Sequence, residues 1–262
     1  MSNIERLNIV GPCATEDREQ ILQCAWSARE RGIKIIRGSL WKPRTVPSDF
    51  EGVGLAGAPW FAEISRMGIT AGTEVLLPSH VTDLIKAVDV SGGDPAKILF
   101  WLGSRNQNQY IQRGVAERIR LDAPSGVKLM IKNQPWNDEK HWLGIVDYVV
   151  DAGLDPKRLI LCHRGFCANG HANPEKFRNI PDFEMAMRVK EKTGLPMILD
   201  PSHIGGSPEK VFKVVEMAAG YNFDGLMVEV HPDPVSAKTD ADQQLTLKEL
   251  DRLLKRDRRD SL

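Results

Sequence analysis

Eight short apolar runs alternate with segments of helical periodicity along the chain, and this alternation most constrains its fold. Runs of this kind, bounded by Gly and Pro, are typical of strands buried on both faces of a parallel sheet. Eight such units in 262 residues favour a closed (β/α)8 TIM barrel, which typically takes about 250 residues, over an open sheet. We therefore expect a single domain that covers residues 1–262. The runs are residues 7–10, 33–36, 70–75, 98–102, 127–131, 158–161, 196–199 and 224–228.

The segments between these runs support the same fold. Residues 16–31 place apolar side chains at helical spacing and end before Gly32, a common helix stop. Further helices are expected near residues 78–88, 106–121, 137–153, 181–193 and 208–219, with the last barrel helix at 245–258. The charge run in that last segment is most simply a solvated helix face.

A residue that can bind a metal or an anion lies at the end of each predicted strand. In barrels of this type, catalytic groups sit at the carboxyl ends of the strands and face one shared mouth. A functional group at all eight ends is hard to attribute to solvation alone, so we expect an active site there. In strand order these residues are Cys13, Arg37, Glu74, Arg105, Lys132, Arg164, His203 and Glu229.

Part of this set forms a candidate metal site. Taken singly, a strand-end Cys is more often a buried thiol, and a lone His is usually a hydrogen-bonded structural residue. Strands one, seven and eight become neighbours when a barrel closes, which brings the candidate ligands together. They combine soft and hard donors suited to a divalent transition metal. The ligands are Cys13, His203 and Glu229, with Asp240 in the loop after the eighth strand.

A second set of mouth residues is cationic. Burying this many like charges would be costly unless anions compensate them. Several of the cations could instead pair with Asp or Glu at the rim. The fork of arginine suits phosphate and carboxylate groups, so we expect ligands with several negative charges, and in particular phosphorylated substrates. The cations are Arg37, Lys42, Arg44, Arg105, Lys132 and Arg164.

Composition excludes several classes of partner. Thirty-five basic residues balance thirty-five acidic ones, so the net charge gives no reason to expect nucleic acid or a membrane surface. The N-terminal segment has charges where a secretory signal needs an apolar core, and no apolar run approaches the roughly 20 residues of a membrane span. We expect a cytoplasmic protein, in which Cys162 and Cys167 are packing and loop thiols.

Nine sequence motifs, in unbroken order from residue 11 to about residue 245, resemble those of the 3-deoxy-7-phosphoheptulonate (DAHP) synthases. The motifs are GPCATEDREQ (11–20), RGSLWKPRTVPSDFEGVG (37–54), TEV (73–75), LGSRNQNQ (102–109), IKN (131–133), CHRGF (162–166), DPSHIGG (200–206), EVHPDP (229–234) and TDADQQL (239–245). The resemblance looks closest to the catalytic domain that some bacteria fuse to a chorismate mutase. Each motif alone is modest, but nine of them in sequence at predicted strand ends are highly specific.

The resemblance implies a role for each matching residue. Cys13, His203, Glu229 and Asp240 match the family's metal ligands. Arg37, Lys42, Arg105, Lys132 and Arg164 match residues that hold phosphoenolpyruvate, whereas Arg44 and Thr45 match contacts to the aldose phosphate. Glu74 matches a carboxylate close to phosphoenolpyruvate and its water, and Lys42 is a candidate for protonating the developing alkoxide. The catalytic set implied is Lys42, Cys13, His203 and Glu74.

The same resemblance implies an activity, a cofactor and partners. The expected enzyme joins phosphoenolpyruvate to D-erythrose 4-phosphate and releases phosphate, the first step of the shikimate pathway to aromatic amino acids. It would use a divalent metal, with Mn²⁺ expected first and Fe²⁺, Co²⁺ or Zn²⁺ as alternatives. We expect a homodimer or homotetramer, and a separate chorismate mutase is a further candidate partner.

Three other functions stay open at this point. A 3-deoxy-octulosonate 8-phosphate synthase performs the same chemistry on a longer aldose phosphate, but that family usually carries Ala-Asn-Arg-Thr where this chain has Lys42-Pro43-Arg44-Thr45. A diverted relative would condense phosphoenolpyruvate with a modified aldose and retain the motifs. A non-catalytic barrel that regulates a chorismate mutase would be expected to lack a ligand or a cation, and no such loss is visible.

Overall fold

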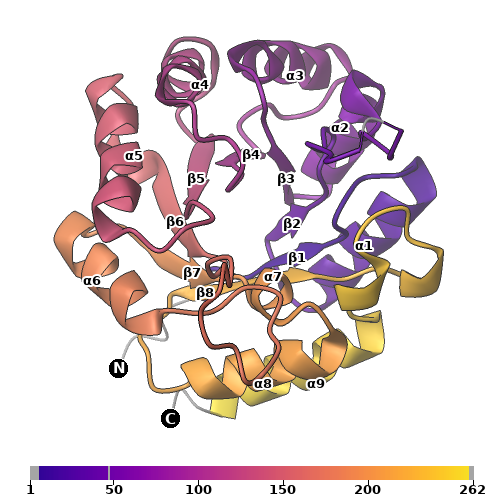
Figure 1. Ribbon diagram of the computed structural model, residues 1–262. Coiled ribbons are helices and arrows are strands. Elements are labelled where there is room, and N and C mark those ends of the chain that lie inside the picture. Colours follow the sequence, from indigo (N-terminus) through magenta and orange to yellow (C-terminus); the bar gives the residue numbers. More distant parts are fainter. Residues whose placement is uncertain (1–5, 47, 260–262) are drawn as a thin grey trace.

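The computed structural model describes residues 6–46 and 48–259 and contains a closed barrel of eight parallel strands (Figure 1). Each strand pairs with its neighbour in sequence, and β1 pairs with β8 to close the ring. The TIM-barrel prediction is thereby confirmed. The strands are β1 (Ile9–Gly11), β2 (Ile35–Arg37), β3 (Thr70–Glu74), β4 (Ile98–Leu102), β5 (Lys128–Lys132), β6 (Leu159–His163), β7 (Met197–Leu199) and β8 (Gly225–Glu229).

Helices surround the barrel and follow the strands in sequence, except that the five-residue α7 (Pro201–Gly205) lies near the centre of the view in Figure 1. They are α1 (Arg18–Glu30), α2 (Ala58–Arg66), α3 (Pro78–Val90), α4 (Gln109–Asp122), α5 (Glu139–Asp151), α6 (Phe183–Thr193), α7 (Pro201–Gly205), α8 (Pro208–Ala218) and α9 (Leu247–Arg259). Short 3₁₀ helices are η1 (Gly54–Gly57), η2 (Pro156–Arg158), η3 (Pro234–Ser236) and η4 (Ala241–Gln243). In the described part of the chain, no helix combines the length and apolarity needed to cross a membrane.

The sequence pattern located the strands better than it located the helices. All eight predicted strands and the seven predicted helical segments are present, with bounds that differ by at most three residues. Helices α2 and α7 were not predicted. Helix α2 follows the Gly-rich segment 52–57 and has Pro near its start, so its apolar periodicity is short and diluted. Helix α7 has only five residues, too few to show a period.

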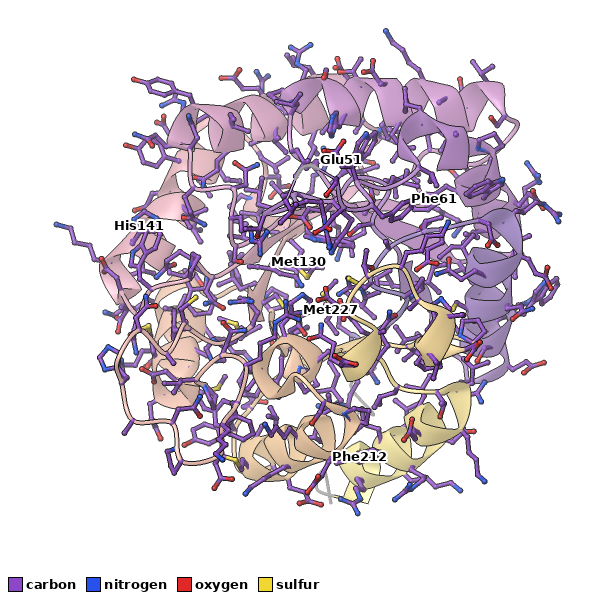
Figure 2. All side chains as sticks on the ribbon, turned by 45° about the vertical axis from the view of Figure 1, so that its right-hand side comes forward. Glu51, Phe61, Met130, His141, Phe212 and Met227 are labelled. Carbon is purple, nitrogen blue, oxygen red and sulfur yellow. The ribbon has the colours of Figure 1, made fainter. Side chains whose placement is uncertain are left out.

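Two layers of core hold the barrel together. Along β4, Leu99 and Trp101 point into the barrel, whereas Ile98, Phe100 and Leu102 belong to the cluster beneath the helices. This alternation is the expected consequence of a strand's period of two. Met130 and Met227 lie in the inner cluster, at the centre of the molecule in Figure 2. The interior is thus filled with side chains, and open space is left at the ends of the strands.

Truncation of an inner side chain should test this packing. Met130 is fully buried, so Met130→Ala should lower the free energy of unfolding by about 2–5 kcal/mol through lost burial and a residual cavity. Val90→Ala is a suitable control, because Val90 is 88% exposed and its truncation should change stability by less than about 0.5 kcal/mol. Urea unfolding of both variants measures the difference. Equal urea midpoints for the two variants would contradict the conclusion that side chains fill the barrel interior.

Candidate active site

The carboxyl ends of the strands open into a cavity of about 170 Å³. Its walls combine the predicted cations with carboxylates and an imidazole, so the strand ends bring these side chains together at one cavity. Cys13 and Glu229 are fully buried and do not line the cavity. The lining residues are Arg37, Lys42, Pro43, Arg44, Thr45, Asp49, Glu74, Trp101, Gly103, Ser104, Arg105, Lys132, Arg164, Arg178, His203 and Asp240.

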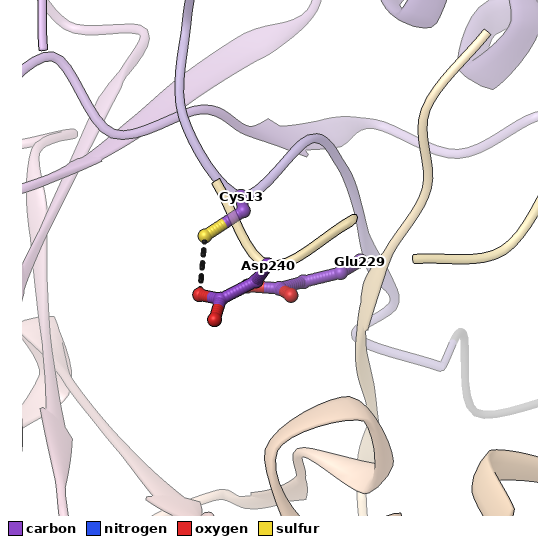
Figure 3. Close-up of side chains that lie close together, drawn as sticks. All are labelled: Cys13, Glu229 and Asp240. Atoms are coloured by element: carbon purple, nitrogen blue, oxygen red, sulfur yellow. Dashed lines mark hydrogen bonds between the residues drawn. The ribbon is translucent and has the colours of Figure 1, made fainter. Parts of the chain in front are cut away.

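Three of the four predicted metal ligands form a tight cluster (Figure 3). One ligand atom each from Cys13, Glu229 and Asp240 lies within 4.8 Å of the others, and Cys13 Sγ donates to Asp240 Oδ2 at 3.0 Å. Strand pairing explains the proximity, because β1 and β8 are neighbours and Gly11 lies opposite Glu229. The cluster therefore brings together residues from near the start and near the end of the sequence.

The fourth predicted ligand lies beside this cluster. His203 Nε2 is 3.7 Å from Glu229 Oε1, and its other ring nitrogen, Nδ1, is 2.8 Å from Asp200 Oδ2. A carboxylate on the far nitrogen is the usual support of a metal-binding histidine, because it fixes the tautomer and raises the basicity of the free nitrogen. Burial lowers the pKa of His203, so the ring is neutral at neutral pH, as metal binding requires.

The donor set fits a divalent transition metal. Burial raises the pKa of the Cys13 thiol to about 12, and Glu229 adds to the shift, so a thiolate there needs a strong positive charge beside it. Asp240 has the left-handed backbone conformation, with φ of 49°, which is uncommon outside Gly and is often found at functional sites. A thiol, an imidazole and two carboxylates at one point are ligands that Mn²⁺, Fe²⁺, Co²⁺ and Zn²⁺ can share.

The deep cations of the site are paired with carboxylates. Arg37 Nη2 lies 3.0 Å from Glu229 Oε1, and Lys132 Nζ lies 2.7 Å from Asp200 Oδ2, with all four side chains buried. The indole of Trp101 forms a floor beneath both cations, at 5.3 Å from Arg37 Cζ and 5.8 Å from Lys132 Nζ. The alternative that some cations pair with acidic residues is therefore correct for this deep layer.

Other cations are held by neutral groups. Arg164 Nη1 donates to Asn179 Oδ1 at 2.8 Å, and Arg105 Nη1 donates to the carbonyl of Pro43 at 3.2 Å. Among the described residues, neither arginine has a carboxylate within ion-pair distance. These cations retain charge for an external anion.

Lys42 connects the cationic and metal-binding parts of the site. Its Nζ donates to Cys13 Sγ at 3.1 Å, and its backbone N–H is fixed by the carbonyl of Glu51 at 2.9 Å. Burial by itself lowers the pKa of Lys42, but Cys13, Glu74 and nearby carboxylates outweigh it and leave the pKa above its usual value. Lys42 is thus a protonated donor at neutral pH.

Glu74 reaches the cavity because Gly103 leaves room for it. A Cβ added at Gly103 would lie 1.9 Å from Glu74 Oε1, so any other residue there would displace the carboxylate. Glu74 is otherwise buried at the end of β3. The pair therefore places one carboxylate in the wall of the cavity that Lys42 and Asp240 also line.

Several residues of the site were not predicted to act there, among them Asp200, Arg178 and Gln243. Asp200 joins Lys132 to His203 and also caps α7, and it directly follows the seventh strand, where the same strand-end rule would have found it. Arg178 Nη1 donates to Asp240 Oδ1 at 2.9 Å and to Gln243, whose amide donates to Glu229 Oε2. Asp200 and Gln243 lie within two of the nine sequence motifs, whereas Arg178 lies in a loop without periodicity and no sequence signal indicated it.

The carboxyl of Asp200 is ionised at neutral pH. Burial by itself raises its pKa, but His203, which is protonated in the acid range where a carboxyl titrates, and Lys132 outweigh burial and hold the pKa well below its usual range. An ionised carboxylate in this position can accept from both partners at once. It therefore connects the imidazole of the candidate metal ligands to a lysine of the cationic set.

Comparisons with known proteins agree with this geometry. The chain matches the DAHP synthetase I family over residues 3–261. Phospho-2-dehydro-3-deoxyheptonate aldolase of Thermotoga maritima is 29% identical over 241 residues, which cover 90% of this chain and 64% of that protein. This chain thus spans less than two thirds of that relative's length. A 2-dehydro-3-deoxyphosphooctonate aldolase of Nitrobacter hamburgensis is 27% identical over 267 residues, which cover 95% of this chain and 85% of that protein.

Solved structures share the barrel. The crystal structure of phospho-2-dehydro-3-deoxyheptonate aldolase (DAHP synthase) from Thermotoga maritima matches with a TM-score of 0.82 at 25% identity, over 98% of this chain and 69% of that one. A truncated 3-deoxy-D-arabino-heptulosonate 7-phosphate synthase from the same organism gives a TM-score of 0.79 at 24% identity, over 98% and 87% of the two chains. At 24% identity, this second match supports the fold alone.

Neutralising Asp200 should weaken metal binding without unfolding the barrel. Asp200→Asn retains an acceptor for the α7 cap but removes the charge that orients His203, so affinity for Mn²⁺ should fall by about 10–100-fold. Competition with a chromophoric chelator measures the affinity. Asp224→Asn is the matched control, because Asp224 also pairs with a lysine, Lys190, but precedes β8 at the opposite end of the barrel. Unchanged affinity in Asp200→Asn would contradict the assignment.

Proposed function

Because the chain belongs to the DAHP synthetase I family, we propose that it is a metal-dependent 3-deoxy-7-phosphoheptulonate synthase. It would condense phosphoenolpyruvate with D-erythrose 4-phosphate and release phosphate, as the first step of the shikimate pathway to aromatic amino acids. The observation that carries the proposal is a cluster of a thiol, an imidazole and carboxylates beside one cavity, whose lining cations Arg105 and Arg164 have no carboxylate partner among the described residues. The name of the Thermotoga maritima relative supports the same activity.

The metal would be held by Cys13, His203, Glu229 and Asp240, with Mn²⁺ first and Fe²⁺, Co²⁺ or Zn²⁺ as alternatives. When bound, the ion supplies a Lewis acid for the aldehyde oxygen of the acceptor. Arg37 holds Glu229 in place through a buried ion pair, and Asp200 does the same for the imidazole of His203. These supports keep the ligands in fixed orientations before substrate arrives.

Phosphoenolpyruvate would be bound by the cations of the inner cavity. Arg105 and Arg164 have no carboxylate partners among the described residues, so they suit its phosphate and carboxylate. Lys132 and Arg37 are fixed by ion pairs and lie over the indole ring of Trp101, where they would help to orient the same ligand. Holding both ends of the molecule exposes its C3 carbon toward the acceptor and offsets the charge that the two substrates bring together.

The remaining steps are assigned to residues of the chain. The C3 carbon of phosphoenolpyruvate attacks the aldehyde carbon, and protonated Lys42 gives a proton to the alkoxide that forms. Water then adds at C2 and would give its proton to the carboxylate of Glu74, which lines the cavity, and phosphate leaves by cleavage of the bond between C2 and the phosphate oxygen. Arg44 and Thr45 at the outer rim would bind the phosphate of the acceptor.

The other candidate functions predict different measurements. The octulosonate relatives are 25–27% identical to this chain, and their substrate would be a five-carbon aldose phosphate. A diverted enzyme would need another acceptor, and a regulatory barrel would bind a chorismate mutase without turnover. We further propose that the catalytic domain covers residues 1–262, acts in the cytoplasm and forms a homodimer or homotetramer.

Metal removal and acceptor choice test the proposal together. Protein stripped with a chelator should not consume phosphoenolpyruvate, and added Mn²⁺ should restore consumption with erythrose 4-phosphate. Loss of phosphoenolpyruvate absorbance is followed in parallel with erythrose 4-phosphate and arabinose 5-phosphate. Preference for the five-carbon sugar would support the octulosonate function instead. No consumption of phosphoenolpyruvate with either sugar would contradict the proposal.

Replacement of Lys42 tests the assigned proton donor. Lys42→Gln keeps a hydrogen-bonding side chain but cannot protonate the alkoxide, so kcat should fall by about 10²–10⁴-fold. Lys238→Gln is the control, because Lys238 lies in the loop after β8 and contacts Phe50 without lining the cavity. Steady-state kinetics with both substrates measure the effect. A Lys42→Gln enzyme with nearly full kcat would refute the assignment.

A further inference from the structure

We propose that Asp49 competes with the phosphate of the aldose for the guanidinium of Arg44 and thereby sets the affinity for the second substrate. The inference rests on the proposed function and deepens it at one subsite. Both residues line the cavity. Arg44 Nη2 lies 3.0 Å from Asp49 Oδ2, so a carboxylate of the chain already occupies part of the arginine fork that the substrate phosphate would need.

The loop between the two residues creates this contact. Its base is closed by the N–H of Lys42, which donates to the carbonyl of Glu51 at 2.9 Å. Within the loop, the N–H of Asp49 donates to the carbonyl of Val46 at 3.1 Å, which turns the chain back toward Arg44. The base is tightly packed, since a Cβ added at Gly52 would lie 2.1 Å from the carbonyl oxygen of Leu40. The loop therefore presents the Asp49 carboxylate to Arg44 by its own fold.

Arg44 has donor capacity that Asp49 does not use. Among the residues that the structure describes, its Nε is buried without a hydrogen-bond partner, and a single contact from Nη2 is weaker than the two-point contact that a guanidinium can form. A phosphate with more charge and more oxygens can engage Nε and Nη2 together. It must then displace Asp49 or lie against its negative charge, and either outcome opposes binding.

The contact is also exposed enough to exchange. The side chains of Arg44 and Asp49 are 22% and 42% exposed, whereas those of Arg37 and Glu229 are 2% and 0% exposed. A half-exposed carboxylate can turn into water when a better ligand arrives, and a fully buried one cannot. Asp49 is thus an exchangeable occupant of the subsite, in contrast to the fixed carboxylates beneath it.

The test removes the charge of Asp49 and keeps its shape. Asp49→Asn should lower the KM for erythrose 4-phosphate about two- to fivefold, the range expected from an ion pair of this exposure. The KM for phosphoenolpyruvate should stay the same, because among the described residues Asp49 forms an ion pair with Arg44 and with none of the cations proposed to bind phosphoenolpyruvate. Glu51→Gln is the matched control: Glu51 is an exposed carboxylate of the same loop (labelled in Figure 2) and does not line the cavity.

A double-mutant cycle with Arg44→Ala locates the effect. If Asp49 acts through Arg44, the gain from Asp49→Asn should vanish in the Arg44→Ala background. An equal fall in KM in Glu51→Gln would show a general charge effect and overturn the proposal. A rise in KM in Asp49→Asn would overturn it too, since the carboxylate would then contact the sugar favourably.

Binding measurements separate this proposal from the proposed function. Erythritol 4-phosphate carries the phosphate but no aldehyde, so calorimetric titration reports the subsite without turnover. Tighter binding by Asp49→Asn than by wild type or Glu51→Gln supports the competition even if the wild type fails to consume erythrose 4-phosphate. Equal binding by all three proteins would overturn it, whatever the wild-type activity.

Discussion

Closure of the parallel barrel is the constraint on which the candidate site depends. Because β1 pairs with β8 and each other strand pairs with its sequence neighbour, all eight carboxyl ends face one rim. The pairing of Gly11 with Glu229 brings Cys13 to a carboxylate from the far end of the chain. Local propensity cannot produce this proximity, since ladder pairing alone decides which distant segments meet. The contacts among carboxylates, cations and imidazole all follow from that shared rim.

Within the rim, the cations differ in how their charge is compensated. Arg37 pairs with Glu229 and Lys132 with Asp200 where water is excluded, because a lone buried charge costs several kcal/mol. Arg105 is held by a backbone carbonyl, and the buried Arg164 is held by the amide oxygen of Asn179, so both keep their charge available. The buried ion pairs fix the shape of the site, and the two arginines that neutral groups hold are the ones suited to bind anions.

Much of this arrangement could be predicted from the sequence, and the exceptions have physical causes. Runs of apolar residues revealed all eight strands, because burial on both faces leaves a strong pattern. The rule that function follows strand ends brought Cys13 and Glu229 into one set. The rule assigned one residue to each strand end and therefore omitted Asp200, although Asp200 directly follows β7. Arg178 and the Arg44–Asp49 contact depend on how irregular loops fold back, which no periodicity encodes.

The shared carboxylate of Asp200 has a thermodynamic consequence. Its Oδ2 lies within 2.8 Å of both Lys132 Nζ and His203 Nδ1, so the two partners divide one negative charge. An anion that pairs with Lys132 would weaken the contact between Lys132 and Asp200. The carboxylate would then interact more strongly with Nδ1 of His203, and Nε2 would become a better electron-pair donor to a cation. Coupling free energies are reciprocal, so a cation on the imidazole would favour the anion to the same degree. Binding of an anion beside Lys132 and of a cation on His203 would therefore favour each other through a single buried oxygen.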